Sequence, residues 1–198
     1  LHKAIRRQRQ MCIRDRDNAA VAIQAYRVYC QNQDLPVNQE SIQRGISQTK
    51  WAGRFEKISE HPTVVIDGAH NISAVDEIVK LLDSDFHDKK ITILMGILAD
   101  KQADKMVEKM ATVPNVSIVL TRFSGPGKRA AADPKKLEKI VDSKTGNGTV
   151  TAVFSDWQRA TDTVYGQLSS DGILLITGSL YFISDVRKYL LSKSANCK

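Results

Sequence analysis

Val-Val-Ile-Asp-Gly-Ala-His-Asn, residues 64–71, is the stretch of this sequence that decides its fold. Three β-branched apolar residues predict a buried strand, and the five residues after them suit neither a strand nor a core. In an open α/β sheet, ligands bind in loops just beyond the carboxyl ends of the strands. There Asp67 can accept hydrogen bonds from ribose hydroxyls, and His70 can donate to a carboxylate or phosphate. The alternative is a structural turn in which Asp67 caps the next helix and His70 is a partly buried polar group.

The chain beyond this stretch repeats the pattern of a strand followed by a helix. Apolar runs predict strands at Thr63–Asp67, Ile91–Gly96, Val116–Thr121, Val150–Phe154 and Ile173–Thr177. Helical periodicity appears at Ser73–Leu82, Lys101–Met110, Pro134–Val141, Trp157–Leu168 and Tyr181–Leu191. Ser73 and Asp133 are the expected N-caps. The alternation predicts an α/β, Rossmann-like fold, in which a mostly parallel sheet has helices on both faces.

Two helices are expected before this domain. The first begins near Asp17 or Asn18, either of which can cap it, and the second covers Asn38–Ser47, where Ile42 and Ile46 recur four residues apart. These two helices are interpreted as the end of a larger preceding domain.

The first sixteen residues differ from the rest of the chain. They carry six basic residues against one acid, a balance of +5 out of the total of +7, which leaves +2 for the remaining residues. Residues 11–16, Met-Cys-Ile-Arg-Asp-Arg, resemble a peptide produced when sequencing-adapter DNA is translated. We interpret residues 1–16 as such an artefact. The alternative is a natural basic arm that contacts nucleic acid or an acidic membrane surface.

Composition excludes several classes of protein. The remaining charge of +2 is too small to supply many phosphate contacts, so no nucleic-acid partner is expected. No apolar run approaches the roughly 20 residues needed to cross a bilayer, and no apolar segment of a signal peptide follows the basic start. Three widely spaced cysteines form no metal-binding pattern and are expected to be free thiols. The chain is predicted to be soluble and cytoplasmic, with no membrane partner.

Six short motifs carry a resemblance to a known family. They are Asn-Ala-Ala (18–20), Trp-Ala-Gly-Arg-Phe-Glu (51–56), Asp-Gly-Ala-His-Asn (67–71), Met-Gly-Ile-Leu-Ala-Asp-Lys (95–101), Arg-Ala (129–130) and Thr-Gly-Ser-Leu-Tyr (177–181). In their order and spelling they resemble the folylpolyglutamate synthases of the Mur ligase superfamily. Ala52 replaces the family's usual proline, and Gln102 stands where an acid is common.

The resemblance implies an ATP-dependent amide ligase. Such an enzyme phosphorylates the γ-carboxylate of a folate or tetrahydrofolate polyglutamate, and L-glutamate attacks the acyl phosphate; dihydrofolate synthase activity can accompany it. The resemblance assigns Asn18, Arg54 and Asp67 to ATP, and His70 and Ser179 to holding or orienting glutamate. It also implies a monomeric full-length enzyme.

The resemblance also indicates what this chain lacks. The sequence contains no Gly-x-x-x-x-Gly-Lys-Ser/Thr loop; Gly-Pro-Gly-Lys at 125–128 does not have that spacing, and Arg129 after it is expected to be a structurally paired surface residue. No acidic cluster replaces the family's Mg2+ site, and phosphoryl transfer requires such elements. We therefore assign residues 17–50 to the last helices of the central ATP-binding domain and residues 51–198 to the C-terminal glutamate ligase domain. The metal ligands are expected in the missing amino-terminal part, and this fragment alone is expected to be nearly inactive.

Two other functions remain open from the sequence. One is a different Mur-type ligase, such as a peptidoglycan-precursor or cyanophycin-type enzyme. The motif Asp-Gly-Ala-His-Asn and the Gly-Ser-Leu-Tyr ending favour the folate branch over this alternative. The other is a Rossmann-like module that binds nucleotide without catalysis.

Overall fold

The computed structural model describes residues 13–49, 51–142 and 149–196. Residues 1–12, which make up most of the segment interpreted as an artefact, lie outside these ranges, as do residues 50, 143–148 and 197–198. The chain divides into two compact units, with the boundary between Trp51 and Ala52. Each unit is described separately.

The first unit consists of two helices, α2 (Ile13–Asn32) and α3 (Gln39–Gln48). The expected cap at Asp17 or Asn18 is wrong, because α2 already runs without a break from Ile13. Helix α3 begins where predicted, with the Asn38 side chain accepting a hydrogen bond from the backbone N–H of Ser41 (2.9 Å).

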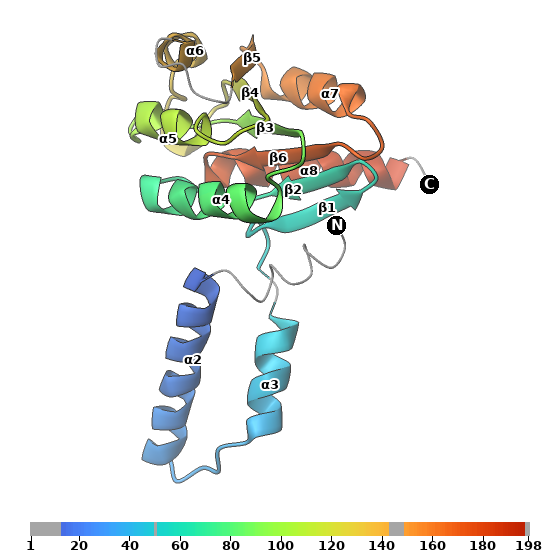
Figure 1. The fold of residues 1–198 in the computed structure, drawn as a ribbon. Helices are drawn as coiled ribbons and strands as arrows, with labels where there is room; N and C mark the ends of the chain where they lie inside the picture. Colours follow the sequence, from blue (N-terminus) through green and yellow to red (C-terminus); the bar gives the residue numbers. More distant parts are fainter. Residues whose placement is uncertain (1–12, 50, 143–148, 197–198) are drawn as a thin grey trace. The chain divides into compact units, whose positions relative to one another are not determined.

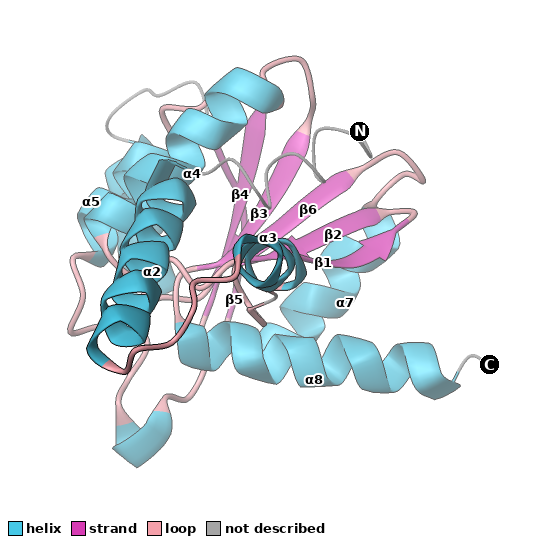
Figure 2. Ribbon diagram, turned by 90° about the horizontal axis from the view of Figure 1, so that it is seen from below, coloured by secondary structure: helices cyan, strands magenta, loops and turns pink. Residues whose placement is uncertain are grey.

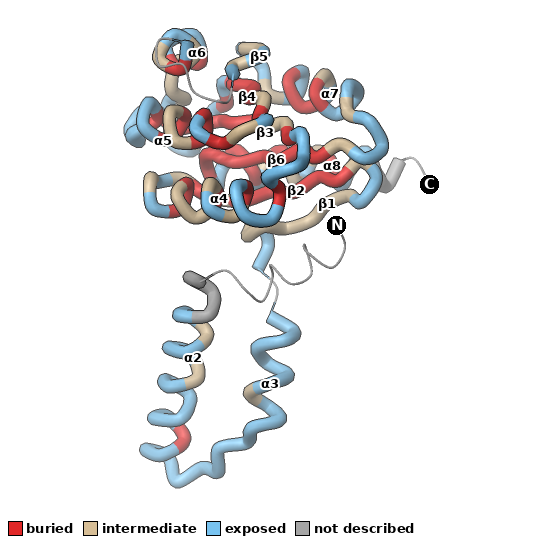
Figure 3. The backbone as a smooth tube through the Cα atoms, in the orientation of Figure 1, coloured by how far each residue is buried: buried red, intermediate tan, exposed pale blue. Residues whose placement is uncertain are grey.

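Apolar side chains of the first unit remain largely in solvent. Val21 is 69% exposed and Tyr29 is 58% exposed, and of this unit's residues with described burial only Cys30 is buried (Figure 3). Two helices alone cannot surround these apolar side chains, so the described part of this unit has no core of its own. Within the described ranges, no helix combines the length and the apolar character needed to cross a membrane.

The second unit is built on one six-stranded sheet with the order β1-β2-β6-β3-β4-β5 (Figures 1 and 2). Its strands are β1 (Glu56–Glu60), β2 (Thr63–Ile66), β3 (Ile91–Met95), β4 (Val116–Thr121), β5 (Thr149–Phe154) and β6 (Ile173–Thr177). Only the β1–β2 pair is antiparallel. The predicted mostly parallel α/β sheet is therefore confirmed, and β6, the last strand in the chain, lies at its centre.

Helices cover both faces of the sheet. They are α4 (Ile72–Asp85), α5 (Ala103–Met110), α6 (Pro134–Asp142), α7 (Trp157–Gln167) and α8 (Leu180–Asn196), with a short 3-10 helix η1 (Pro126–Lys128). Helices α4, α5 and α6 pack side by side, and α7 and α8 pack together on the opposite face (Figure 2). Beneath α7 and α8, Leu174 and Ile176 of β6 pack in one buried cluster with Phe182 and Val186. This core fixes the start of α8 beside the end of β6.

One strand was missed by the sequence analysis, and two expected N-caps can be compared with the structure. Strand β1 was not predicted, because a charged edge strand shows no apolar run. The expected N-cap Ser73 is wrong: α4 begins at Ile72, and the Asn71 carboxamide accepts from the Ala74 N–H (2.9 Å). The expected N-cap Asp133 is confirmed, since its carboxylate accepts from the Lys135 N–H at 3.2 Å.

Asp162 links α7 to α8. Its carboxylate accepts hydrogen bonds from Lys193 Nζ (2.6 Å) and Tyr189 Oη (2.7 Å). Burial alone would raise the pKa of Asp162, but the hydrogen bonds from Lys193 and Tyr189 outweigh it and bring the pKa below its ordinary value of 3.8. Because the folded-state pKa is lower than the unfolded one, this contact stabilises the fold above about pH 4 and is lost as the pH falls through the folded-state pKa.

Asp162→Asn is expected to flatten the acid side of the stability profile. The wild-type chain loses this contribution on acidification, whereas the asparagine variant has none to lose. Because both charged side chains are about half exposed, the difference at neutral pH is expected to stay below about 1 kcal/mol. The measurement is the midpoint of thermal unfolding between about pH 6 and pH 3. Asp83→Asn, at an exposed position on α4, serves as control, and equal slopes for Asp162→Asn and the wild-type chain would contradict this role.

Candidate functional site at the carboxyl ends of β2 and β6

The loops after β2 and β6 lie side by side, because these two strands are parallel neighbours in the sheet. The Asp67 N–H donates to the Ile176 carbonyl at 2.9 Å, and the Gly178 N–H donates to the Ala69 carbonyl at 3.1 Å. Two segments more than a hundred residues apart in the sequence thereby form one surface. This is the edge of an α/β sheet at which ligands bind.

Asp67 holds the first of these loops together. Its side chain is buried, with the residue 6% exposed. Oδ1 accepts from the Ala69 N–H and Oδ2 accepts from the Phe55 N–H, both at 2.9 Å. A buried carboxylate needs such donors, since an unpaired one is costly. Asp67 does not cap α4, so that part of the structural alternative is wrong; Asn71 is the cap.

The segment before β1 is pinned against this loop. The Gly68 N–H donates to the Gly53 carbonyl (2.7 Å), and the Gly53 N–H donates to Glu56 Oε2 (2.7 Å). Gly53 has φ +75° and Phe55 has φ +43°, so the half-buried Arg54 lies between two residues with left-handed backbone. For a phenylalanine that conformation is uncommon and requires support from its surroundings.

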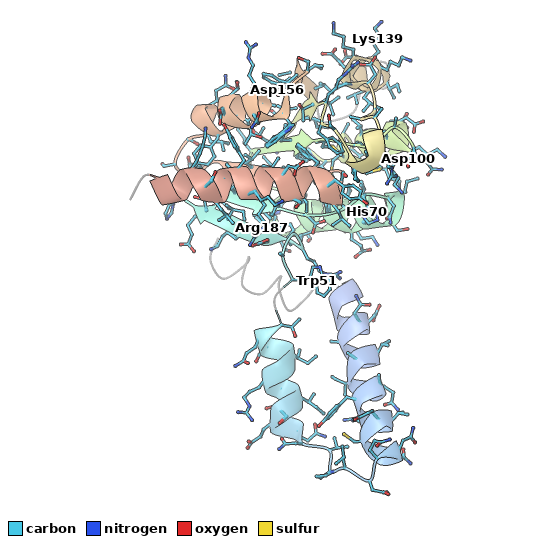
Figure 4. The ribbon with its side chains drawn as sticks, turned by 180° about the vertical axis from the view of Figure 1, so that it is seen from behind. Trp51, His70, Asp100, Lys139, Asp156 and Arg187 are labelled. Atoms are coloured by element: carbon cyan, nitrogen blue, oxygen red, sulfur yellow. The ribbon has the colours of Figure 1, made fainter. Side chains whose placement is uncertain are left out.

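His70 has one ring nitrogen engaged within the loop. Nδ1 lies 2.8 Å from the Gly68 carbonyl oxygen. A carbonyl only accepts, so Nδ1 carries the proton in this contact, and Nε2 remains for other partners. Nε2 accepts a hydrogen bond when the imidazole is neutral and donates one when it is protonated. Figure 4 shows His70 at the end of the unit where α8 begins.

Ser179 begins the second loop's turn into α8. It is buried (3% exposed), and its carbonyl accepts the Ile183 N–H at 3.0 Å. Before it, Gly178 has φ +111°, and a Cβ there would lie 2.7 Å from the Gly96 carbonyl oxygen. Helices α4 and α8 both start at this edge, and their amino ends favour negative charge.

The structure brings together four of the five residues assigned from the resemblance. Arg54, Asp67, His70 and Ser179 lie in the second unit and are linked by the backbone hydrogen bonds described above. Asn18 is exposed on α2 of the first unit.

Of two ion pairs near this edge, one was expected from the sequence and the other was not. Arg129 forms an ion pair with Asp100 and lies 6.0 Å from the centre of the Tyr181 ring, which confirms the expected paired arginine. The second pair, Glu56 with Arg187, was not predicted. Its partners are 131 residues apart, and neither stands in a pattern that signals the other.

Comparison with known proteins agrees with this architecture. Residues 53–180 match the family model described as "Mur ligase, glutamate ligase domain". The match covers more than half of the chain. The chain belongs to the Mur ligase family. The sequence was predicted to resemble the C-terminal portion of a folylpolyglutamate synthase, and the curated relatives and solved structures described next confirm this prediction.

Two curated relatives of this Mur ligase domain illustrate that similarity. A folylpolyglutamate synthase of Lacticaseibacillus casei is 33% identical over 178 residues, covering 88% of this chain and 38% of the relative. The dihydrofolate synthase/folylpolyglutamate synthase of Bacillus subtilis is 30% identical over 179 residues, covering 88% and 39%. The chain thus spans about two fifths of the length of these relatives.

Solved Mur ligase structures share the fold. Escherichia coli FolC in complex with ADP superimposes with a TM-score of 0.74 and 23% identity, covering 90% of this chain and 40% of that one. A bifunctional folylpolyglutamate synthase/dihydrofolate synthase with Mn, AMPPNP and L-glutamate bound gives a TM-score of 0.66 at 24% identity, covering 79% of this chain and 36% of that one.

Proposed function

We propose that this Mur ligase domain is part of an enzyme that adds L-glutamate to the γ-carboxylate of folate or tetrahydrofolate polyglutamates. The observation that carries the proposal is the joined edge after β2 and β6, where the His70 imidazole and the amino ends of α4 and α8 lie and to which the backbone on both sides of Arg54 is hydrogen-bonded. The helix amino ends and the positive charge of Arg54 favour an anionic ligand, and the His70 imidazole does so when it is protonated. ATP, when bound, supplies the phosphoryl group that activates the folate carboxylate for attack by glutamate.

The nucleotide-binding residues of this chain are proposed to be Arg54, Asp67 and Asn18. Arg54 offers a fixed cationic fork that suits phosphate oxygens. Asp67 already accepts hydrogen bonds from the backbone amides of Phe55 and Ala69. Because each carboxylate oxygen has two lone pairs and can accept more than one hydrogen bond, Asp67 would also accept one from a ribose hydroxyl. Asn18 is the third residue proposed to bind ATP, and its carboxamide can both donate and accept a hydrogen bond.

Glutamate is proposed to bind at His70 and Ser179. Since Nδ1 of His70 donates to the Gly68 carbonyl, Nε2 is the atom that faces substrate. A protonated ring would bind a glutamate carboxylate, and a neutral ring would accept a hydrogen bond from the glutamate amine. Ser179 would position the substrate at the start of α8.

The first unit is proposed to be the last two helices of the Mur ligase central domain. Its exposed apolar side chains would then pack against the rest of that domain. Residues 51–198 would form the glutamate ligase domain, and residues 1–16 would be a translated sequencing-adapter artefact. No group of three or more His, Cys, Asp or Glu side chains suited to a metal occurs among the described residues, and Mg2+ is assigned to the central domain. The whole enzyme is proposed to be a cytoplasmic monomer.

The test measures the KM for ATP and the KM for glutamate separately, in variants of the enzyme encoded by the complete gene. Arg54→Met is expected to raise the KM for ATP by roughly 10- to 100-fold, the cost of a lost charged hydrogen bond. His70→Ala is expected to raise the KM for glutamate by a similar factor and to leave the KM for ATP within about twofold. Steady-state rates of ATP-dependent glutamate addition to tetrahydrofolate provide both values.

Arg159→Met, at an exposed position on α7, is the matched control and is expected to change neither constant. Turnover with a peptidoglycan precursor in place of folate would identify another Mur-type ligase. Nucleotide binding without any turnover would instead favour a non-catalytic module.

A further inference from the structure

Glu56 and Arg187 form a bidentate ion pair between β1 and α8. Arg187 Nε lies 3.0 Å from Glu56 Oε2 and 3.2 Å from Oε1, and Arg187 Nη2 lies 2.9 Å from Oε1. This fork-to-carboxylate geometry fixes the direction of both side chains. Figure 4 shows Arg187 on α8, the helix that starts immediately after Ser179.

The same Glu56 carboxylate also holds the backbone beside Arg54. Oε2 accepts the Gly53 N–H at 2.7 Å, so one oxygen serves both the arginine and the amide. On the other side of Arg54, the Phe55 N–H is held by Asp67. Both neighbours of Arg54 have left-handed backbone, which Gly53 adopts without strain but which Phe55 keeps only where surrounding contacts enforce it.

Electrostatics agree with a pair that is tightly engaged. The hydrogen bond to Glu56 raises the pKa of the Arg187 guanidinium, although partial burial works in the opposite direction. Glu56 is the more buried partner, with 17% of its side chain exposed against 36% for Arg187. If Arg187 were absent, Glu56 would be a half-buried anion that has lost the three guanidinium contacts that set the direction of its carboxylate.

We propose that Glu56 and Arg187 are positioning residues that hold Arg54 in the orientation needed to bind the nucleotide. Arg187 orients Glu56, Glu56 fixes Gly53, and the constrained backbone then directs Arg54. The pair also ties Arg54 to the helix that carries Ser179 at its start, so that the two substrate subsites keep a constant separation. The nucleotide role of Arg54 rests on the proposed function, but its backbone restraint does not.

The first test uses the 198-residue chain and NMR. In Arg187→Met the Gly53 amide is expected to exchange with solvent at least tenfold faster, and the order parameter of the Arg54 backbone amide to fall from about 0.85 to below about 0.6. The Ala69 amide, held by Asp67, is the internal reference and should keep its protection. Lys188→Met, the exposed neighbour on the same helix, is the matched control. Unchanged exchange and order in Arg187→Met would overturn the proposal.

The second test is a double-mutant cycle in the enzyme encoded by the complete gene. Arg187→Met is expected to raise the KM for ATP on the order of tenfold in the wild-type background and to have no further effect in an Arg54→Met background. An equal effect in both backgrounds would mean that Arg187 acts through general stability, which would overturn the proposal. Arg187→Lys keeps the charge but not the fork, and an intermediate KM is expected; it decides the matter if Arg187→Met does not fold.

The two proposals fail in distinguishable ways. If Arg54→Met leaves the KM for ATP unchanged, the nucleotide assignment of Arg54 is wrong. If Arg54→Met raises that KM but Arg187→Met changes neither the KM nor the Gly53 exchange, the positioning role alone is wrong.

Discussion

Replacing Asp67 with alanine is expected to destabilise the second unit by about 3–5 kcal/mol and to abolish glutamate ligation. The Phe55 and Ala69 amides both donate to this buried carboxylate. Each would lose a charge-assisted hydrogen bond worth about 1.5–3 kcal/mol. The segment that carries Arg54 would also lose one of its hydrogen bonds to the loop that carries His70.

Urea unfolding of the 198-residue chain measures this effect. Trp157 packs edge-on against Tyr189 with ring centres 5.6 Å apart, so its fluorescence reports on the second unit. Asp67→Asn retains one acceptor oxygen but turns an amide N–H2 toward the other donor, and about half of the alanine effect is expected. Asp83→Ala, at an exposed position, should stay within about 0.5 kcal/mol. If Asp67→Ala behaved like that control, the carboxylate would not be holding the loop.

Gly178→Ala is expected to cost about 2–4 kcal/mol, which for a unit of this size lowers the unfolding midpoint by roughly 5–15 °C. Gly178 has φ +111°, which an alanine adopts only under strain, and the added Cβ would lie 2.7 Å from the backbone oxygen of Gly96. Backbone cannot move aside as a side-chain tip can. The strain would displace Ser179 and the first turn of α8, so the KM for glutamate is expected to rise as well.

Gly166→Ala is the matched control, and it is expected to stabilise the unit rather than destabilise it. Gly166 is exposed on α7, and nothing lies within 4 Å of an added Cβ. Alanine in a helix is favoured over glycine by up to about 1 kcal/mol, so this variant should melt at a slightly higher temperature. Calorimetry of both variants compares them directly, and a Gly178→Ala chain as stable as the wild type would refute the steric argument.

Much of the sheet could be predicted from local patterns alone. Strands β4 and β6 have the bounds that their apolar runs predict, because buried parallel strands appear as continuous hydrophobic stretches. Strand β1 escaped prediction because it is held by pairing to β2 and shows one aliphatic residue, Ile58, among charged and polar neighbours. The strand with which a segment pairs cannot be inferred from the residues of that segment alone.

In the candidate site, too, local features could be predicted from the sequence and long-range contacts could not. The loop with Asp67 and His70 was identified because its polar residues follow a strand directly. The contacts that shape it were not, since the Asp67 bond to Phe55 and the Glu56–Arg187 pair join segments far apart in the sequence. The bond from Gly178 to Ala69 depends on β6 lying next to β2, which residue types alone do not determine.

The central place of β6 has a consequence for how this protein is made. Until β6 leaves the ribosome, the sheet exists only as two separate pieces, β1-β2 and β3-β4-β5, each with an exposed apolar edge. The final strand closes both edges at once and, in the same step, brings Ala69 and Gly178 into register. The candidate ligand-binding edge therefore forms only after β6 has been synthesised, and until then the two unpaired strand edges are open to aggregation.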